Sequence, residues 1–189
     1  MADPFNHSEY IFYKYAGAVG VFDGDGNSIM YAEREGVSKI GKPIHVYTSK
    51  YRTKELLTIS SPKIWKESVY ISWPITPPNW EYHVTDVAAK EDVGSIVQKS
   101  RIRITRDDWL LISRGITVGR LKSIRYWLHS LIWPRKYKII AQDGREVGTF
   151  EQHREILNFK YTMTITEQCI DTRLLVAAGI IITALNTGF

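Results

Sequence analysis

An apolar run near the C-terminus, residues 174–185, restricts the fold more than any other feature, with one glycine and one threonine as its only interruptions. A helix over this run has no polar face, so it must be buried on all sides, in a protein core or in a membrane. A membrane-spanning helix needs about 20 apolar residues, and this run has twelve. Since Asp171 or Thr172 can cap its start, we predict a buried core helix over about 171–186. A short membrane tail is the alternative.

A core helix without a polar face needs a shell, and the rest of the chain offers one in a recurring hairpin pattern. Each copy is an alternating apolar segment, a short polar turn and a second such segment, as in WLLIS and VGRLK around RGIT, or YKIIA and GTFEQ around QDGREV. Alternation with a period of two places one face in a core and the other in water. Because antiparallel strands must close or stack to hide their edges, we predict a mainly β fold. The expected architecture is a closed antiparallel barrel of about twelve strands that encloses the hydrophobic C-terminal helix, as a single domain over residues 1–189.

The segment VFDGDGNSIMYAE, residues 21–33, holds one of these turns and also imitates a calcium loop. Asp23, Asp25 and Asn27 stand at alternate positions, as the first three ligands of an EF-hand do. The motif also needs Gly at its sixth position and Glu at its twelfth, where this sequence has Ser and Arg34. We therefore predict a hairpin turn and no metal site.

One stretch, RLKSIRYWLHSLIWPRK at residues 120–136, departs from the strand pattern. Its leucines and isoleucines follow helical spacing, basic residues occupy other positions around the wheel, and Pro134 ends the pattern. We predict a short helix over about 120–133. We favour a crossover helix that plugs one end of the barrel, and the alternative is an interfacial helix that Trp127 and Trp133 anchor at a membrane.

Charge is distributed unevenly along the chain, whose formal net charge is +5. Residues 99–138 carry eleven basic and two acidic side chains, so this segment is +9 and the remainder is −4. Such asymmetry is typical of a protein with a polyanionic partner, either a membrane surface or nucleic acid, although solvated strand faces can carry the same charges. No signal peptide is recognisable, and a single cysteine fits a reducing compartment. We expect a cytoplasmic protein that can associate peripherally with a membrane.

Residues suited to catalysis are sparse. The five histidines are scattered without metal-binding pairs, and neither a P-loop nor a G-x-S-x-G nor a G-x-G-x-x-G motif is present. Asp107 and Asp108 are adjacent, so on a strand they would face opposite ways and could not work as an acid–base pair. Cys169, beside the core helix, is expected to be a buried, inert thiol. We predict that the protein is not an enzyme and has no catalytic residue, metal site or cofactor.

Three segments resemble the tubby-like barrel superfamily, specifically its LURP-one-related and phospholipid-scramblase-like branch. They are VFDGDGNSIMYAE, RKYKIIAQDGREVGTFEQ and the ending FKYTMTITEQCIDTRLLVAAGIIITAL. The resemblance implies a twelve-stranded closed barrel that the terminal helix threads. It also implies membrane association, because tubby proteins bind phosphoinositide headgroups through basic residues and scramblase-like members act at membranes. Calcium dependence and scramblase activity are not carried over, since only Glu167 and Asp171 precede the helix as strong ligands and no cysteine-rich palmitoylation tract is present.

These features favour peripheral binding of anionic phospholipid headgroups at a membrane surface. The expected anion-binding residues are Arg101, Arg103, Arg120, Lys122, Arg125, Arg135 and Lys136, with Trp127 and Trp133 at the membrane interface. One alternative is an intracellular scaffold, and another is a nucleic-acid-binding module that uses the basic segment 99–138. The sequence indicates no particular protein partner.

Overall fold

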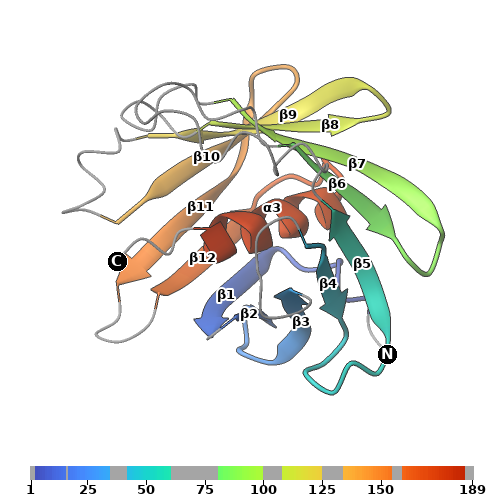
Figure 1. The fold of residues 1–189 in the computed structure, drawn as a ribbon. Helices are drawn as coiled ribbons and strands as arrows, with labels where there is room; N and C mark the ends of the chain where they lie inside the picture. Colours follow the sequence, from blue (N-terminus) through green and yellow to red (C-terminus); the bar gives the residue numbers. More distant parts are fainter. Residues whose placement is uncertain are drawn as a thin grey trace, which may run out of the picture.

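Twelve antiparallel strands close into one barrel within the part of the chain that the computed structural model describes, residues 3–15, 17–34, 42–60, 81–99, 108–124, 134–154 and 159–185 (Figure 1). The strands are β1 (Glu9–Tyr15), β2 (Ala18–Asp23), β3 (Ser28–Arg34), β4 (Ile44–Tyr47), β5 (Glu55–Ser60), β6 (Glu81–Asp86), β7 (Glu91–Gln98), β8 (Trp109–Ser113), β9 (Ile116–Ser123), β10 (Lys136–Ala141), β11 (Glu146–Arg154) and β12 (Phe159–Ile165). The helix α3 spans Thr172–Leu185. The predicted fold class is confirmed.

Neighbouring strands in the sequence are also neighbours in the barrel, which closes between β1 and β12, where Tyr10 lies opposite Met163. In β1, Tyr10 and Phe12 are fully buried, whereas the alternate residues Ile11 and Tyr13 are only partly buried. This alternation is the period-two pattern of the sequence, with the apolar set inside the barrel.

The helix α3 fills the interior of the barrel (Figure 1). Every residue from 174 to 183 is buried, and the helix packs against β1, β2, β7 and β12. Asp171 is its N-cap, because the Asp171 Oδ1 accepts a hydrogen bond from the Arg173 backbone N–H (2.9 Å) and the Asp171 carbonyl accepts one from that of Leu174 (3.0 Å). The predicted core helix is therefore confirmed, with its cap at the expected place.

The two ends of α3 define two rims of the barrel. At the start rim, where α3 begins, turns join β2 to β3, β6 to β7, β8 to β9 and β10 to β11. At the finish rim, where α3 ends, β1 and β9 end and β10 and β12 begin. The Lys14 Nζ, near the end of β1, donates to the Ala184 carbonyl oxygen (3.1 Å). This contact places a cation at the negative end of the helix dipole.

The turn between β2 and β3 is the predicted hairpin turn. The Asp23 Oδ1 accepts hydrogen bonds from the backbone N–H groups of Asn27 (2.8 Å) and Asp25 (3.1 Å), and the Asn27 side-chain amide donates to the same carboxylate. Gly26 has φ +85°, a conformation that glycine adopts without strain. Since the turn itself uses the Asp23 carboxylate, the alternating Asp and Asn residues have a structural explanation.

Two expectations differ from the structure. The short helix cannot begin at Arg120, because residues 120–123 belong to β9, where Leu121 is buried inside the barrel and hydrogen bonds run to β8 and β10. The rest of that predicted helix, residues 125–133, lies outside the described residues. Cys169 was expected to be buried beside the helix, but it is exposed, because the link between β12 and α3 runs along the start rim before the chain enters the barrel.

Candidate functional site

Three of the basic residues predicted from sequence, Arg120, Lys122 and Lys136, lie on the outer face of β9 and β10. Arg120 and Lys122 flank the inward-facing Leu121, so both side chains project outward from β9. Lys138 of β10 lies directly opposite Lys122, and Leu110 of β8 lies opposite Arg120. We call the outward-facing Arg120, Lys122, Lys136 and Lys138 the β9–β10 basic surface, which Arg135 adjoins just before β10.

The members of this surface differ in how far their charges are balanced. The Lys138 Nζ donates to the Glu146 Oε2 (2.6 Å), and Lys136 forms an ion pair with Glu151. Arg120 and Lys122 form no ion pair with any residue that the structure describes. Like charges directly opposite each other in a sheet repel, so the Lys122–Lys138 pair raises the local positive potential. The strongest available attraction for an anion is therefore at Arg120 and Lys122.

Arg135 is fixed at the beginning of β10 by its main chain. The Arg135 N–H donates to the Gln152 side-chain oxygen (3.1 Å), and the Gln152 N–H donates to the Arg135 carbonyl (2.7 Å). These bonds continue the β10–β11 ladder to the finish rim. The predicted residues Arg120, Lys122 and Lys136 thus lie on adjoining strands, and Arg135 lies just before β10.

The remaining predicted site residues cannot be placed. Arg101, Arg103, Arg125, Trp127 and Trp133 lie outside the described residues. Lys138 was not among the predicted site residues, although it shares an outward face with Lys136 by the period-two rule.

Charge is separated between the two rims among the described residues. The finish rim and the strand ends beside it carry basic side chains at Lys14, Arg34, Lys42, Lys99, Lys122, Arg135, Lys136 and Lys160 and acidic ones at Glu33, Glu81, Asp108 and Glu151. The start rim carries acidic side chains at Asp3, Asp23, Asp25, Asp86, Glu91, Asp92, Asp143, Glu146, Glu167 and Asp171 and basic ones at Lys54, Lys90, Arg114, Arg145 and Arg173, with Lys50 in the turn between β4 and β5. Arg52 of the same turn forms an ion pair with Glu33 (2.6 Å), so this pair adds no net charge to either rim. The β9–β10 basic surface lies next to the basic rim.

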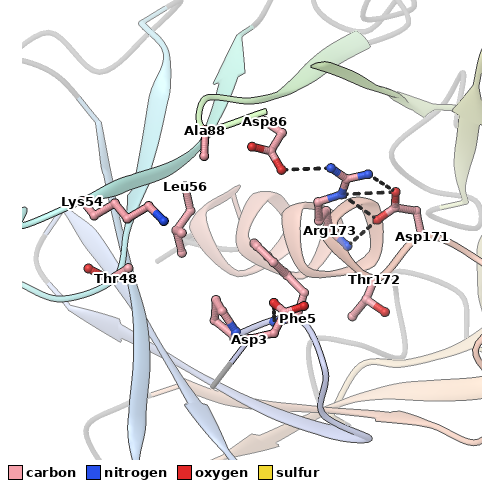
Figure 2. Close-up of a pocket in the computed structure, with 11 residues that line it drawn as sticks. Asp3, Phe5, Thr48, Lys54, Leu56, Asp86, Ala88, Asp171, Thr172 and Arg173 are labelled. Atoms are coloured by element: carbon pink, nitrogen blue, oxygen red, sulfur yellow. Dashed lines mark hydrogen bonds and ion pairs between the residues drawn. The ribbon is translucent and has the colours of Figure 1, made fainter. Parts of the chain in front are cut away.

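A pocket of about 550 Å³ opens at the start rim, beside the first turn of α3 (Figure 2). Phe5, Leu56 and Ala88 give it an apolar lining, and the Lys54 side chain extends toward it. Arg173 also lines the pocket, but its guanidinium is already bound to carboxylates. It contacts Asp171 (2.7 Å), Asp86 (2.9 Å) and Glu91 (3.3 Å).

These carboxylates raise the pKa of Arg173, chiefly through the Asp171 hydrogen bonds. Burial raises the pKa of Asp86, but the hydrogen bonds from Ala89 and Arg173 outweigh it and leave the pKa below its usual range. The Arg173 network therefore joins the start of α3 to the hairpin of β6 and β7. Because three carboxylates already bind its guanidinium, Arg173 has a structural role and does not serve as a binding site for an added anion.

Comparison of the sequence with protein-family models gave no match, and comparison with curated proteins gave none. Among solved structures, the chain is similar to the X-ray structure of a protein from Arabidopsis thaliana, with a TM-score of 0.58 and 11% sequence identity. The match covers 98% of this chain and 97% of that chain. At this identity the likeness shows a shared fold over essentially the whole length: a closed twelve-stranded antiparallel barrel with a core helix. In the described residues, no helix is both long enough and apolar enough to cross a bilayer.

Proposed function

We propose that this protein is a non-enzymatic barrel domain that binds anionic phospholipid peripherally at a membrane surface. We further propose that it belongs to the tubby-like superfamily, in the LURP-one-related and scramblase-like branch, without inferring scramblase activity. The observation that carries the lipid proposal is the pair of outward cations on β9, Arg120 and Lys122, which have no ionic partner among the described residues.

The energetics of a charged surface support this function. Each Lys or Arg held near an anionic membrane contributes about 1 kcal/mol to binding. Arg120 and Lys122 alone would contribute about 2 kcal/mol, and the partly balanced Lys136 and Lys138 would add less. Binding of this kind weakens as salt screens the charges. The anionic lipid of the cytoplasmic leaflet makes that leaflet the proposed location.

The family assignment rests on the sequence segments and on the fold together. The three segments that resemble the tubby-like family fall on the β2–β3 hairpin, the β10–β11 hairpin and the β12–α3 ending. All three are parts of one closed barrel around a core helix, which is the fold that the resemblance implied.

Liposome flotation tests the lipid proposal. The purified protein is floated with phosphatidylcholine vesicles and with phosphatidylcholine–phosphatidylserine vesicles, at low and high salt. The Arg120→Glu/Lys122→Glu variant reverses the two charges on which the proposal rests. Lys54→Glu/Lys90→Glu is the matched control, because it makes the same charge change at the start rim.

We expect the wild type and the control to float with anionic vesicles at low salt, and the Arg120→Glu/Lys122→Glu variant to remain at the bottom. Absence of flotation by the folded wild type under every condition would overturn the proposal. Flotation with neutral vesicles regardless of salt would also contradict it. Tight binding of a fluorescent oligonucleotide in place of vesicles would favour the nucleic-acid alternative.

A further inference from the structure

The basic character of the finish rim extends well beyond β9 and β10. Lys42, just before β4, and Lys99, just after β7, are both exposed. Lys160, in β12, lies over the Tyr13 ring with its Nζ 5.7 Å from the ring centroid. Because β4, β7 and β12 are well separated in the strand order, these cations stand on different sides of the barrel. Among the described residues, positive charge is thus found on several sides of the finish rim and is not confined to one face.

The start rim has the opposite character, and two of its cations, Arg145 and Arg173, are already neutralised by carboxylates. The Arg145 guanidinium contacts Glu167 (2.7 Å) and Asp143 (2.6 Å), and Arg173 is bound by three carboxylates. Asp25 and Asp92 are exposed at the same rim and have no ion pair among the described residues. An anionic membrane would therefore repel this end of the barrel.

The length of the barrel keeps the acidic rim away from a membrane that touches the basic rim. A seven-residue strand such as β1 is about 20 Å long. Because barrel strands tilt by about 40° from the barrel axis, the rims are about 15 Å apart, which is about one and a half Debye lengths at 0.1 M salt, so a membrane that touches one rim acts less strongly on the other. With the finish rim against the membrane, the basic side chains feel its potential and the acidic ones are screened. The reverse orientation exposes the carboxylates to repulsion.

We infer that the barrel docks end-on, with the finish rim toward an anionic membrane and the start rim toward solvent. In this orientation the C-terminal end of α3 is the end nearest the lipid. The partial negative charge there is already met by Lys14, which donates to the Ala184 carbonyl. The inference rests on the proposed lipid binding and adds to it the orientation and the full extent of the docking surface.

The single cysteine of the chain gives a direct test. Cys169 is exposed at the start rim and can carry an environment-sensitive fluorophore. A second protein, Cys169→Ser/Ile124→Cys, carries the same fluorophore at an exposed position just after β9, at the finish rim. Each is titrated with phosphatidylcholine–phosphatidylserine vesicles, and binding is measured separately by co-sedimentation. We expect a blue shift and quenching by a lipid-borne quencher at position 124 and no change at position 169.

A matched pair of neutral substitutions provides a readout that does not depend on the label. Lys99→Gln lies at the finish rim, outside the β9–β10 basic surface, and Lys54→Gln lies at the start rim; both side chains are exposed. We expect Lys99→Gln to bind anionic vesicles about fivefold more weakly and Lys54→Gln to bind as the wild type does.

Failure of the orientation and failure of lipid binding give different results. If co-sedimentation shows no binding, the proposed function fails and the orientation fails with it. If the protein binds but position 169 responds, or positions 124 and 169 respond equally, the end-on orientation is wrong while lipid binding stands. Equal effects of Lys99→Gln and Lys54→Gln would likewise overturn the orientation.

Discussion

Enclosure of α3 predicts that Gly179→Ala destabilises the protein. Gly179 is buried in the middle of the helix, where it faces the ring of Phe12. A Cβ atom at Gly179 would lie 2.5 Å from the Phe12 Cζ and 2.8 Å from its Cε1. The Phe12 ring cannot easily withdraw, because it is fully buried and packs edge-on against Phe150, which in turn stacks on Tyr161.

The change in unfolding free energy that Gly179→Ala causes is the difference between two opposing effects. Alanine is favoured over glycine in a helix interior by about 1 kcal/mol. Forcing a methyl group into a well-packed core costs about 1–3 kcal/mol. Because the clash involves two ring atoms of a restrained side chain, we expect overpacking to win, with a net loss of about 1 kcal/mol and at most about 2 kcal/mol. For a chain of this size, each kcal/mol lowers Tm by about 2–4 °C.

Urea unfolding and thermal unfolding, followed by circular dichroism, measure the effect, and Phe12→Val supplies the control. Phe12→Val alone destabilises by about 2 kcal/mol through the cavity that it leaves. In that background Gly179→Ala should be neutral or stabilising, which gives a favourable coupling of about 1–2 kcal/mol in the double-mutant cycle. A Gly179→Ala variant that is more stable than the wild type, with no coupling to Phe12, would refute the enclosure of the helix.

Two further predictions concern the Arg173 network and the β2–β3 turn. Arg173→Met should lower the free energy of unfolding by about 2 kcal/mol at pH 7, because Asp86, Asp171 and Glu91 lose their shared donor. In the wild type the lowered pKa of Asp86 stabilises the native state at neutral pH, and this contribution is lost as the pH falls below about 4. Urea unfolding should therefore show that the difference in unfolding free energy between the two proteins shrinks as the pH is lowered below about 4. A gap that does not change with pH would contradict the network. In the turn, hydrogen bonds from Asn27 hold the pKa of Asp23 below its usual range, so Asp23→Ala should lower Tm, and millimolar calcium should leave the Tm of the wild type unchanged. A calcium-dependent rise in Tm that Asp23→Ala abolishes would show that the turn is a cation site.

The fold could be predicted from the sequence because its two signals support each other. The run at 174–183 has no polar face, which requires enclosure, and the hairpins supply enough alternating strands to enclose it. The false helix at 120–123 shows where pattern alone is insufficient. Leu121 and Ile124 fit a helical spacing, but Leu121 also fits the inward face of β9, and its hydrogen-bonded neighbours on β8 and β10 decide in favour of the strand.

The sequence predicted where basic residues are concentrated in the candidate site, but not which of them are paired with carboxylates. The density of basic residues in the sequence identifies Lys136 and Lys122 equally. In the structure, however, Lys136 is paired with Glu151, and Lys122 has no such partner among the described residues. That difference depends on which residue lies across the neighbouring strand, which the β10–β11 register fixes. The Arg173 network is hidden for the same reason, because Asp86 lies far from Arg173 in the sequence.

The measurement that tests the central claim most directly is the partition of the wild-type protein onto vesicles as the phosphatidylserine fraction is raised from zero. We expect no partition onto pure phosphatidylcholine, a steep rise with phosphatidylserine and loss of binding when salt is added. Partition that is the same on neutral and anionic vesicles, or absent from both while the protein is folded, would contradict anionic lipid binding.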